Sequence, residues 1–167
     1  AGIMLTASHL PFYFNGIKIF SQTGGAEKSD IAYILTHTEA SEAADGSVKQ
    51  ADLLSRYAAD LVEKIQRGSG NEQPLKGLKI VVDAGNGAGG YFADKVLAVL
   101  GADTSGSQFL EPDGHFPNHI PNPDNKEAMA SIKKAVLDNQ ADLGVIFDTD
   151  VDRSAIVSKD GQMINRN

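Results

Sequence analysis

Two mainly apolar runs, at residues 78–82 and 143–147, most constrain how this chain can fold. A strand that is apolar on both sides must be covered on both faces, as in a parallel sheet between two layers of helices. Helical spacing of apolar residues follows at 90–100 and 126–139, with a weaker strand at 107–110 between them. We therefore predict an α/β fold, a three-layer α/β/α domain with a mostly parallel sheet.

A polar segment rich in helix breakers divides the chain. Residues 67–74 read Arg-Gly-Ser-Gly-Asn-Glu-Gln-Pro, which is typical of a linker between domains. We predict an incomplete α/β domain in residues 1–67, a linker in 68–75 and a second domain in 76–167. Within the second domain, residues 155–164 are expected to form a hairpin at the edge of the sheet.

Local patterns predict the elements of the first part. Short apolar segments at residues 2–6 and 16–20 indicate strands, and a stripe of apolar residues between 54 and 65 indicates an amphipathic helix. Ser47 and Gln50 have the spacing of a capping box before that helix. Both ends of the chain are expected to be cut within a longer protein.

Composition excludes several classes of function. The formal charge of −7, without a basic cluster, argues against binding to nucleic acid or to an anionic membrane. No apolar run approaches the ~20 residues of a membrane-spanning helix, and without a signal-peptide pattern we expect a cytoplasmic location. Cysteine is absent, which excludes disulfides and thiolate ligands and favours a hard cation such as Mg²⁺ for any metal site.

Three aspartates on alternate residues directly follow the second apolar strand. They are Asp148, Asp150 and Asp152. Carboxylates this close repel one another, which implies a cation or a dense set of donors, and their oxygens are the ligands that Mg²⁺ prefers. The ends of strands are also where α/β sheets bind ligands. A solvated acidic turn is the simplest alternative, and a phosphatase that uses Asp148 as nucleophile and Asp150 as acid/base is the alternative within the enzymes.

A second candidate site lies where the first strand breaks into a loop. Ser8 stands beside His9 there, and Lys18 follows. A serine that exchanges phosphoryl groups needs a base, nearby cations and a loop that exposes its oxygen. Composition alone favours the alternative, a strand-end turn in which Ser8 caps backbone donors.

The segment from Asp83 to Gly90 matches the pattern G-x-G-x-x-G. A dinucleotide site would also need an acidic residue about 20 positions further on, and the sequence offers none that is convincing. We interpret the glycines as a tight turn between a strand and a helix and assign them no cofactor.

Five segments occur in the order found in the α-D-phosphohexomutases, the phosphoglucomutase and phosphomannomutase family, which this chain resembles. They are TASHLP, NGIK, VVDAGNGAGG, DGHFPNHIPNP and DTDVDR. The resemblance implies a fragment that spans the end of domain 1 and domain 2 of an intramolecular phosphotransferase. Such an enzyme interconverts hexose 1-phosphate and hexose 6-phosphate through a phosphoserine and a hexose bisphosphate, with Mg²⁺.

The resemblance also assigns roles to individual residues. The assigned residues are Ser8 for phosphorylation, Asp148, Asp150 and Asp152 with the phosphoserine for Mg²⁺, Lys18 for proton transfer, His9 beside the phosphate, and Arg153 facing the active site. Thr149 and Val151 replace the small residues usual between the aspartates, and their bulk is expected to restrict how tightly the loop wraps a cation. We expect the fragment alone to lack mutase activity; a non-catalytic Mg²⁺-binding module is the non-enzymatic alternative.

Overall fold

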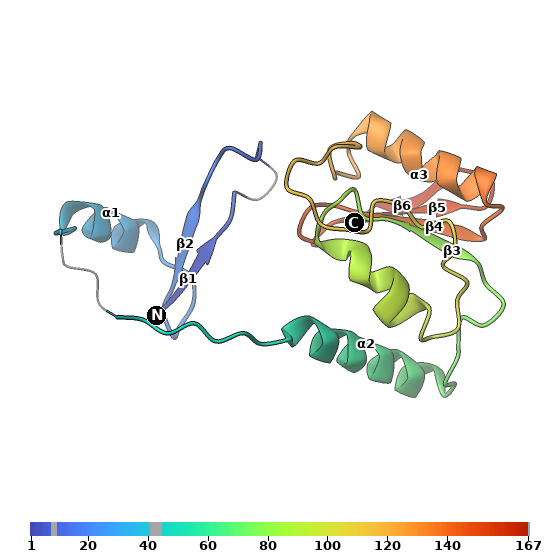
Figure 1. The fold of residues 1–167 in the computed structure, drawn as a ribbon, viewed down its shortest axis with the longest axis horizontal. Helices are drawn as coiled ribbons and strands as arrows, with labels where there is room; N and C mark the ends of the chain where they lie inside the picture. The colour runs from blue at the N-terminus through green and yellow to red at the C-terminus, as the bar shows by residue number, and fades with distance from the viewer. Residues whose placement is uncertain (8–9, 41–44, 167) are drawn as a thin grey trace. The chain divides into compact units, whose positions relative to one another are not determined.

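The computed structural model describes residues 1–7, 10–40 and 45–166, and its contacts divide the chain into two units, Ala1–Ala51 and Asp52–Asn167 (Figure 1). In the first unit, strands β1 (Gly2–Leu5) and β2 (Ile17–Phe20) pair antiparallel and are followed by helix α1 (Lys28–Thr36). The two predicted strands are present. Helix α1 buries none of its residues, and large apolar side chains of the unit are exposed: Ile3, Leu5, Phe12, Tyr13, Tyr33 and Leu35.

The second unit contains a sheet with strand order β3-β4-β5-β6. Its strands are β3 (Ile80–Asp83), β4 (Leu143–Phe147), β5 (Ser154–Ser158) and β6 (Met163–Arg166). The two apolar runs form the parallel pair β3 and β4, whereas β4–β5 and β5–β6 are antiparallel. The α/β class and the edge hairpin are confirmed, and the sheet is mixed.

The segment at residues 107–110, predicted as a weaker strand, pairs with the sheet at only one position among the described residues. Gln108 forms an isolated parallel bridge with Asp83, and the extended conformation ends at once because Phe109 has a φ of 54°. A left-handed residue breaks the ladder geometry that a strand requires. Among the described residues the segment therefore lies beside β3 without forming a strand.

Helices cover both faces of this sheet (Figure 1). Helix α3 (Lys126–Asp138) buries Ile132 and Val136 against one face. The 3-10 turn η1 (Ala88–Gly90) and the π-helical turn η2 (Phe92–Leu97) lie on the other face, where Ala93 packs with Val82 of β3 and Phe147 of β4. The three-layer arrangement places the carboxyl ends of β3 and β4 side by side at one edge of the unit.

Helix α2 (Leu53–Ser69) belongs to the second unit, so the division of the chain at residues 51 and 52 differs from the predicted linker at 68–75. Its apolar stripe requires a partner, and η2 supplies one: Ala58 and Val62 pack with Val96 and Leu100. Residues 68–75 therefore join two packed elements of one unit.

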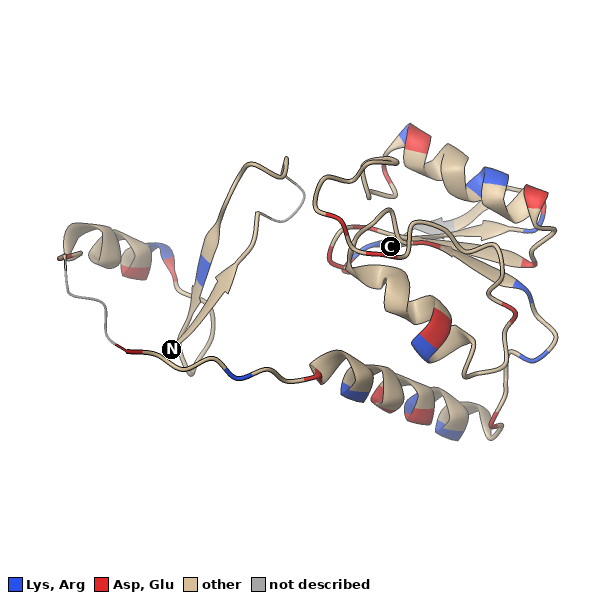
Figure 2. Ribbon diagram, in the orientation of Figure 1, with Lys and Arg blue, Asp and Glu red and all other residues tan. Residues whose placement is uncertain are grey.

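The start of α2 also differs from the predicted capping box. The N-cap is Asp52, whose carboxylate accepts a hydrogen bond from the Ser55 backbone at 2.9 Å, in place of Ser47 and Gln50. The outward face of α2 carries charges of both signs (Figure 2), including the pair Lys64–Asp60 at 2.6 Å. Such exposed pairs keep the helix hydrated and add little stability.

Candidate metal centre

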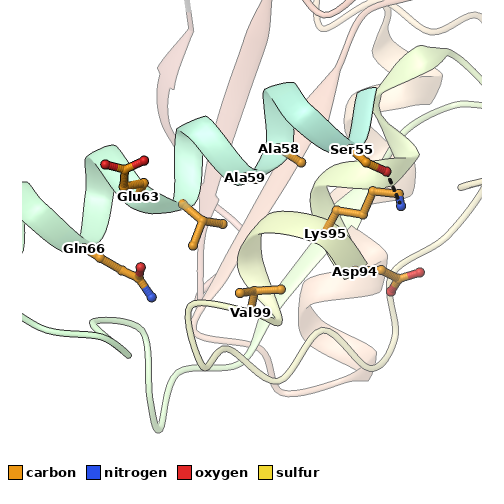
Figure 3. A pocket seen from close by; sticks show the side chains of 9 residues that line it. Ser55, Ala58, Ala59, Glu63, Gln66, Asp94, Lys95 and Val99 are labelled. Carbon is orange, nitrogen blue, oxygen red and sulfur yellow. Dashed lines mark hydrogen bonds between the residues drawn. The ribbon is translucent and has the colours of Figure 1, made fainter. Parts of the chain in front are cut away.

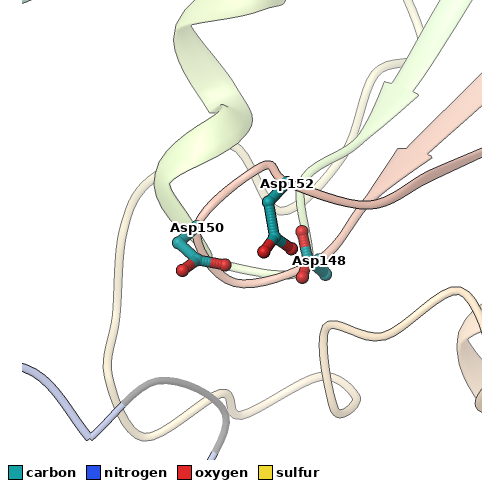
Figure 4. A group of neighbouring side chains, drawn as sticks. All are labelled: Asp148, Asp150 and Asp152. Carbon is teal, nitrogen blue, oxygen red and sulfur yellow. The ribbon is translucent and has the colours of Figure 1, made fainter. Parts of the chain in front are cut away.

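The three predicted aspartates lie together in the loop between β4 and β5 (Figure 4). Asp148, Asp150 and Asp152 each offer a carboxylate oxygen, and these oxygens lie within 4.8 Å of one another. Asp148 is buried at the end of β4, while the other two are exposed. A set of carboxylate oxygens with one open side suits Mg²⁺, which keeps several water ligands. The donor set therefore fits the metal implied by the sequence.

Arg153 closes this loop through Asp148. Its backbone N–H donates to Asp148 Oδ1 at 3.0 Å and its Nε donates to Asp148 Oδ2 at 2.9 Å, while the Asp148 N–H donates to the Arg153 carbonyl at 3.1 Å. Burial raises the pKa of the Asp148 carboxyl, but the hydrogen bonds from Arg153 and Asp152 outweigh it, and the pKa is lowered. Asp148 is therefore held as a carboxylate in a fixed orientation.

The exposed carboxyl group of Asp152 shows the electrostatic effect of placing three aspartates in one loop. The pKa of Asp152 is raised by its hydrogen bond with Asp148 and by the negative charges of Asp148 and Asp150. A raised pKa in a solvent-exposed carboxyl reports repulsion between like charges. A divalent cation between these groups would remove that repulsion.

The environment of Asp148 bears on the phosphatase alternative. Its side chain is 2% exposed, and Arg153 donates to both of its oxygens. A nucleophilic carboxylate must present an oxygen to the substrate phosphorus. The burial of Asp148 therefore argues against a role as nucleophile. A buried carboxylate of fixed orientation is better suited to bind a metal ion.

The glycine-rich turn after β3 supports the aspartate loop. The Ala88 N–H donates to the Thr149 carbonyl at 2.9 Å. A Cβ on Gly87 would lie 2.9 Å from that carbonyl oxygen and 3.1 Å from the Thr149 Cα, so glycine is needed for the two loops to touch. The turn to which we assigned no cofactor thus has a packing role beside the candidate metal ligands.

Val151, which stands between two of the aspartates, has a φ of 69°. Left-handed backbone is strained for a β-branched residue, although the Val151 side chain packs against the cluster of Val82, Ala93 and Phe147.

We predict that Val151→Gly is more stable than Val151→Ala by about 1 kcal/mol, because only glycine adopts this φ without a steric penalty. Both variants lose the same packing of the branched side chain, so their difference isolates the backbone. Urea denaturation measures it. An alanine variant as stable as the glycine variant would show that the loop relaxes to another conformation.

Asp83 and His119 form a buried pair at the end of β3, next to the aspartate loop. His119 Nε2 lies 3.0 Å and 3.1 Å from the two Asp83 oxygens. Ser131 Oγ and Gln108 Nε2 donate to Oδ2 at 2.8 Å and 2.7 Å, and the Gly85 N–H donates to Oδ1 at 2.9 Å. Sequence reasoning did not single out this pair, although Asp83 ends a buried strand just as Asp148 follows one.

The pKa of the His119 side chain is raised in this setting. Burial lowers its pKa, but the hydrogen bond and charge of Asp83, the Ile120 carbonyl and the charge of Glu127 outweigh burial, and the pKa is raised. A histidine whose pKa is raised by folding stabilises the protein fully below its unfolded pKa of about 6.5.

We therefore predict that the second unit loses stability as the pH rises through the folded-state pKa of His119. Urea midpoints measured from about pH 6 to about pH 9 test this. His119→Gln should flatten this profile of stability against pH. A profile that falls equally in the unchanged chain and in His119→Gln would assign the pH dependence to other groups.

The remaining predicted site residues are placed as follows. Ser8 and His9 lie outside the described residues. Lys18 is exposed on β2, opposite Met4, in the first unit. The structure thus brings together Asp148, Asp150, Asp152 and Arg153, which all lie in one loop of the second unit.

A groove between α2 and η2 has a different character (Figure 3). It is lined by small apolar side chains such as Ala58, Ala59, Val62 and Val99. At its rim Lys95 Nζ donates to Ser55 Oγ at 3.2 Å. These residues pack two helices together and present no convergent set of ligands, so the aspartate loop is the stronger candidate site among the described residues.

Comparison with known protein families identifies both parts of the chain. Residues 55–161 match the family model described as phosphoglucomutase/phosphomannomutase, alpha/beta/alpha domain II, and residues 1–45 match the model for domain I. The chain belongs to the phosphoglucomutase/phosphomannomutase family. The resemblance stated from the five sequence segments is confirmed.

Relatives of this family align along nearly the whole chain. Phosphomannomutase/phosphoglucomutase of Pseudomonas putida is 35% identical over 98% of this chain and 34% of its own length. Phosphomannomutase of Salmonella typhimurium is 36% identical over 98% of this chain and 37% of its own length. A family protein from Burkholderia thailandensis has a similar crystal structure, with a TM-score of 0.73 and 31% identity over 97% of this chain and 34% of that one.

The chain thus spans about a third of the length of the curated relatives it matches. None of the helices that the structure describes is long and apolar enough to cross a membrane.

Proposed function

We propose that this chain supplies the phosphorylated serine and the metal-binding loop of a phosphohexomutase, an intramolecular phosphotransferase that interconverts hexose 1-phosphate and hexose 6-phosphate. The convergence of Asp148, Asp150 and Asp152 carries the proposal. Support also comes from the two family domains matched in order and from relatives named as phosphomannomutases and phosphoglucomutases. Hexose phosphates and a hexose bisphosphate are the proposed substrates, and the cytoplasm is the proposed location.

Mg²⁺ is the proposed cofactor of this activity. Asp148, Asp150 and Asp152 would hold it, since their oxygens converge and Arg153 already fixes Asp148. When bound, Mg²⁺ neutralises negative charge on a transferring phosphoryl group.

The residues of this chain would divide the chemistry as follows. The phosphoryl group leaves Ser8 Oγ as its O–P bond breaks and forms a new O–P bond to a hydroxyl of the hexose monophosphate, which gives a bisphosphate. The hydroxyl loses its proton, and Lys18 is the candidate for moving it. In the second half the other phosphate returns to Ser8. His9 is assigned beside the phosphate, and Arg153 keeps Asp148 oriented as a ligand.

Labelling with a hexose bisphosphate tests this assignment. The chain is incubated with Mg²⁺ and ³²P-labelled glucose 1,6-bisphosphate, and the label is located by peptide mass spectrometry. Stable phosphate on Ser8, absent from Ser8→Ala and retained in Ser47→Ala, is the expected result. A hydroxylamine-labile phosphate on Asp148 would instead identify the phosphatase alternative.

We further propose that this chain alone does not complete the mutase cycle. A single transfer to Ser8 needs one bound orientation of the bisphosphate, whereas turnover needs the bisphosphate to be held in two. Glucose 1-phosphate offered to the chain should give no glucose 6-phosphate in a coupled dehydrogenase assay, and measurable conversion would contradict this part of the proposal.

A further inference from the structure

The loop that precedes α3 reaches the candidate metal centre through Arg153. Arg153 Nη1 donates to Asn122 Oδ1 at 3.2 Å, on the opposite side of the guanidinium from the Nε that donates to Asp148. Asp124 lies 3.7 Å from the same Nη1. We propose that Asn122 is a positioning residue, which holds the Arg153 guanidinium in the plane that fixes the Asp148 carboxylate for metal binding.

Asn122 is anchored on its N-terminal side. His119, three residues earlier, is buried in its pair with Asp83. Pro121 is fully buried and packs closely on the turn at Gly85, where an added Cβ would lie 2.8 Å from the Pro121 Cβ. A loop held by a buried ion pair and a buried proline has little freedom at the next residue.

Asn122 is also anchored on its C-terminal side. Its Oδ1 accepts from the Asp124 N–H at 2.9 Å and its carbonyl accepts from the Asn125 N–H at 2.9 Å. Asn125 in turn caps α3 by accepting from the Glu127 and Ala128 backbone at 2.8 Å and 3.0 Å. The position of Asn122 Oδ1 is therefore set by the sheet end on one side and by a helix start on the other.

The guanidinium of Arg153 is held at two points. It is planar, so contacts at Nε and at Nη1 together define its plane, whereas one contact alone leaves it free to rotate. Asn122 is a neutral acceptor and adds no charge to the loop. With Nη1 held, Nε approaches Asp148 from a fixed direction and leaves the remaining lone pairs of that carboxylate for a cation.

This proposal rests on the proposed Mg²⁺ site, and a double-mutant cycle tests it in the full chain. Mg²⁺ affinity is measured by calorimetry for the unchanged chain, Asn122→Ala, Arg153→Ala and the double variant. We expect Asn122→Ala to weaken binding about 10-fold, the scale on which partners of metal ligands act. The effect should vanish when Arg153 is already alanine, because Asn122 acts through it. Independent, additive effects would overturn the proposal.

A second readout does not need the metal. The Nε–H proton of Arg153 gives an NMR signal that can be assigned with Arg153→Lys. This proton should exchange with water more slowly than the Nε–H proton of Arg56, which is exposed on α2. Asn122→Ala should accelerate this exchange several-fold, and Asn122→Asp, which keeps the acceptor oxygen, should restore it. An exchange rate in Asn122→Ala equal to that of the parent chain would overturn the positioning role even if Mg²⁺ binds.

The two proposals can also fail separately. If the parent chain does not bind Mg²⁺ but the exchange rates behave as expected, the proposed metal site is removed and the positioning of Arg153 remains supported.

Discussion

Replacing Asp148 with asparagine is expected to weaken Mg²⁺ binding by about 100-fold or more. Removing a residue that hydrogen-bonds a metal ligand already lowers metal affinity about 10- to 100-fold, and removing a ligand itself should lower it more. Asp148 is the candidate ligand whose orientation is fixed by Arg153. The amide keeps the shape of the side chain but removes its charge and one acceptor oxygen. Calorimetric titration with Mg²⁺ measures the change.

The controls for this experiment separate loss of a ligand from loss of fold. Asp148→Asn leaves the Arg153 guanidinium without its carboxylate, so a thermal melt must accompany it. Asp150→Asn and Asp152→Asn alter exposed members of the set and should weaken binding without unfolding the protein. Asp160→Asn, in the exposed turn between β5 and β6, controls for charge alone. Equal affinities in Asp148→Asn and Asp160→Asn would show that the carboxylates do not bind Mg²⁺ together.

Replacing Asp83 with alanine is expected to lower the free energy of unfolding by about 3–5 kcal/mol, the usual cost of removing one partner of a buried ion pair. Without the Asp83 carboxylate, the buried His119 has no partner for its Nε2 atom. The donors of Ser131, Gln108 and Gly85 also lose their acceptor. Urea denaturation measures this change.

The matched comparison uses an aspartate with a similar local turn and no burial. Asp103 is exposed and accepts from the Ser105 N–H at 2.9 Å, a contact that asparagine retains. Asp103→Asn should therefore change stability by less than about 1 kcal/mol. Asp83→Asn, which keeps the volume but turns a donor toward other donors, should fall between the two. A small effect of Asp83→Ala would mean that water or a shifted side chain replaces the carboxylate.

The parts of this fold that follow from local patterns were predictable from the sequence. The runs at 78–82 and 143–147 contain the buried strands β3 and β4, because consecutive apolar residues require cover on both faces of a sheet. The aspartates were predictable for a similar reason. Their alternate spacing brings three like charges together within a single loop, so no distant part of the chain has to be known.

The features that sequence reasoning missed depend on distant contacts. His119 and Asp83 are 36 residues apart, and neither residue alone distinguishes a buried ion pair from a surface one. Helix α2 belongs to the second unit because its apolar side chains pack against those around η2. The polar residues of the expected linker give no sign of this packing. The segment at 107–110 does not form a strand because the backbone of Phe109 is left-handed. That conformation is uncommon for an aromatic residue, so the sequence does not predict it.

The aspartate loop is also the turn that joins the antiparallel strands β4 and β5. Hairpins with short connections are among the first long-lived contacts that a folding chain makes, while β3 must be brought from far along the sequence to pair with β4. Repulsion between the three carboxylates therefore opposes folding at an early step. Divalent cations that relieve this repulsion should therefore speed the folding of the second unit.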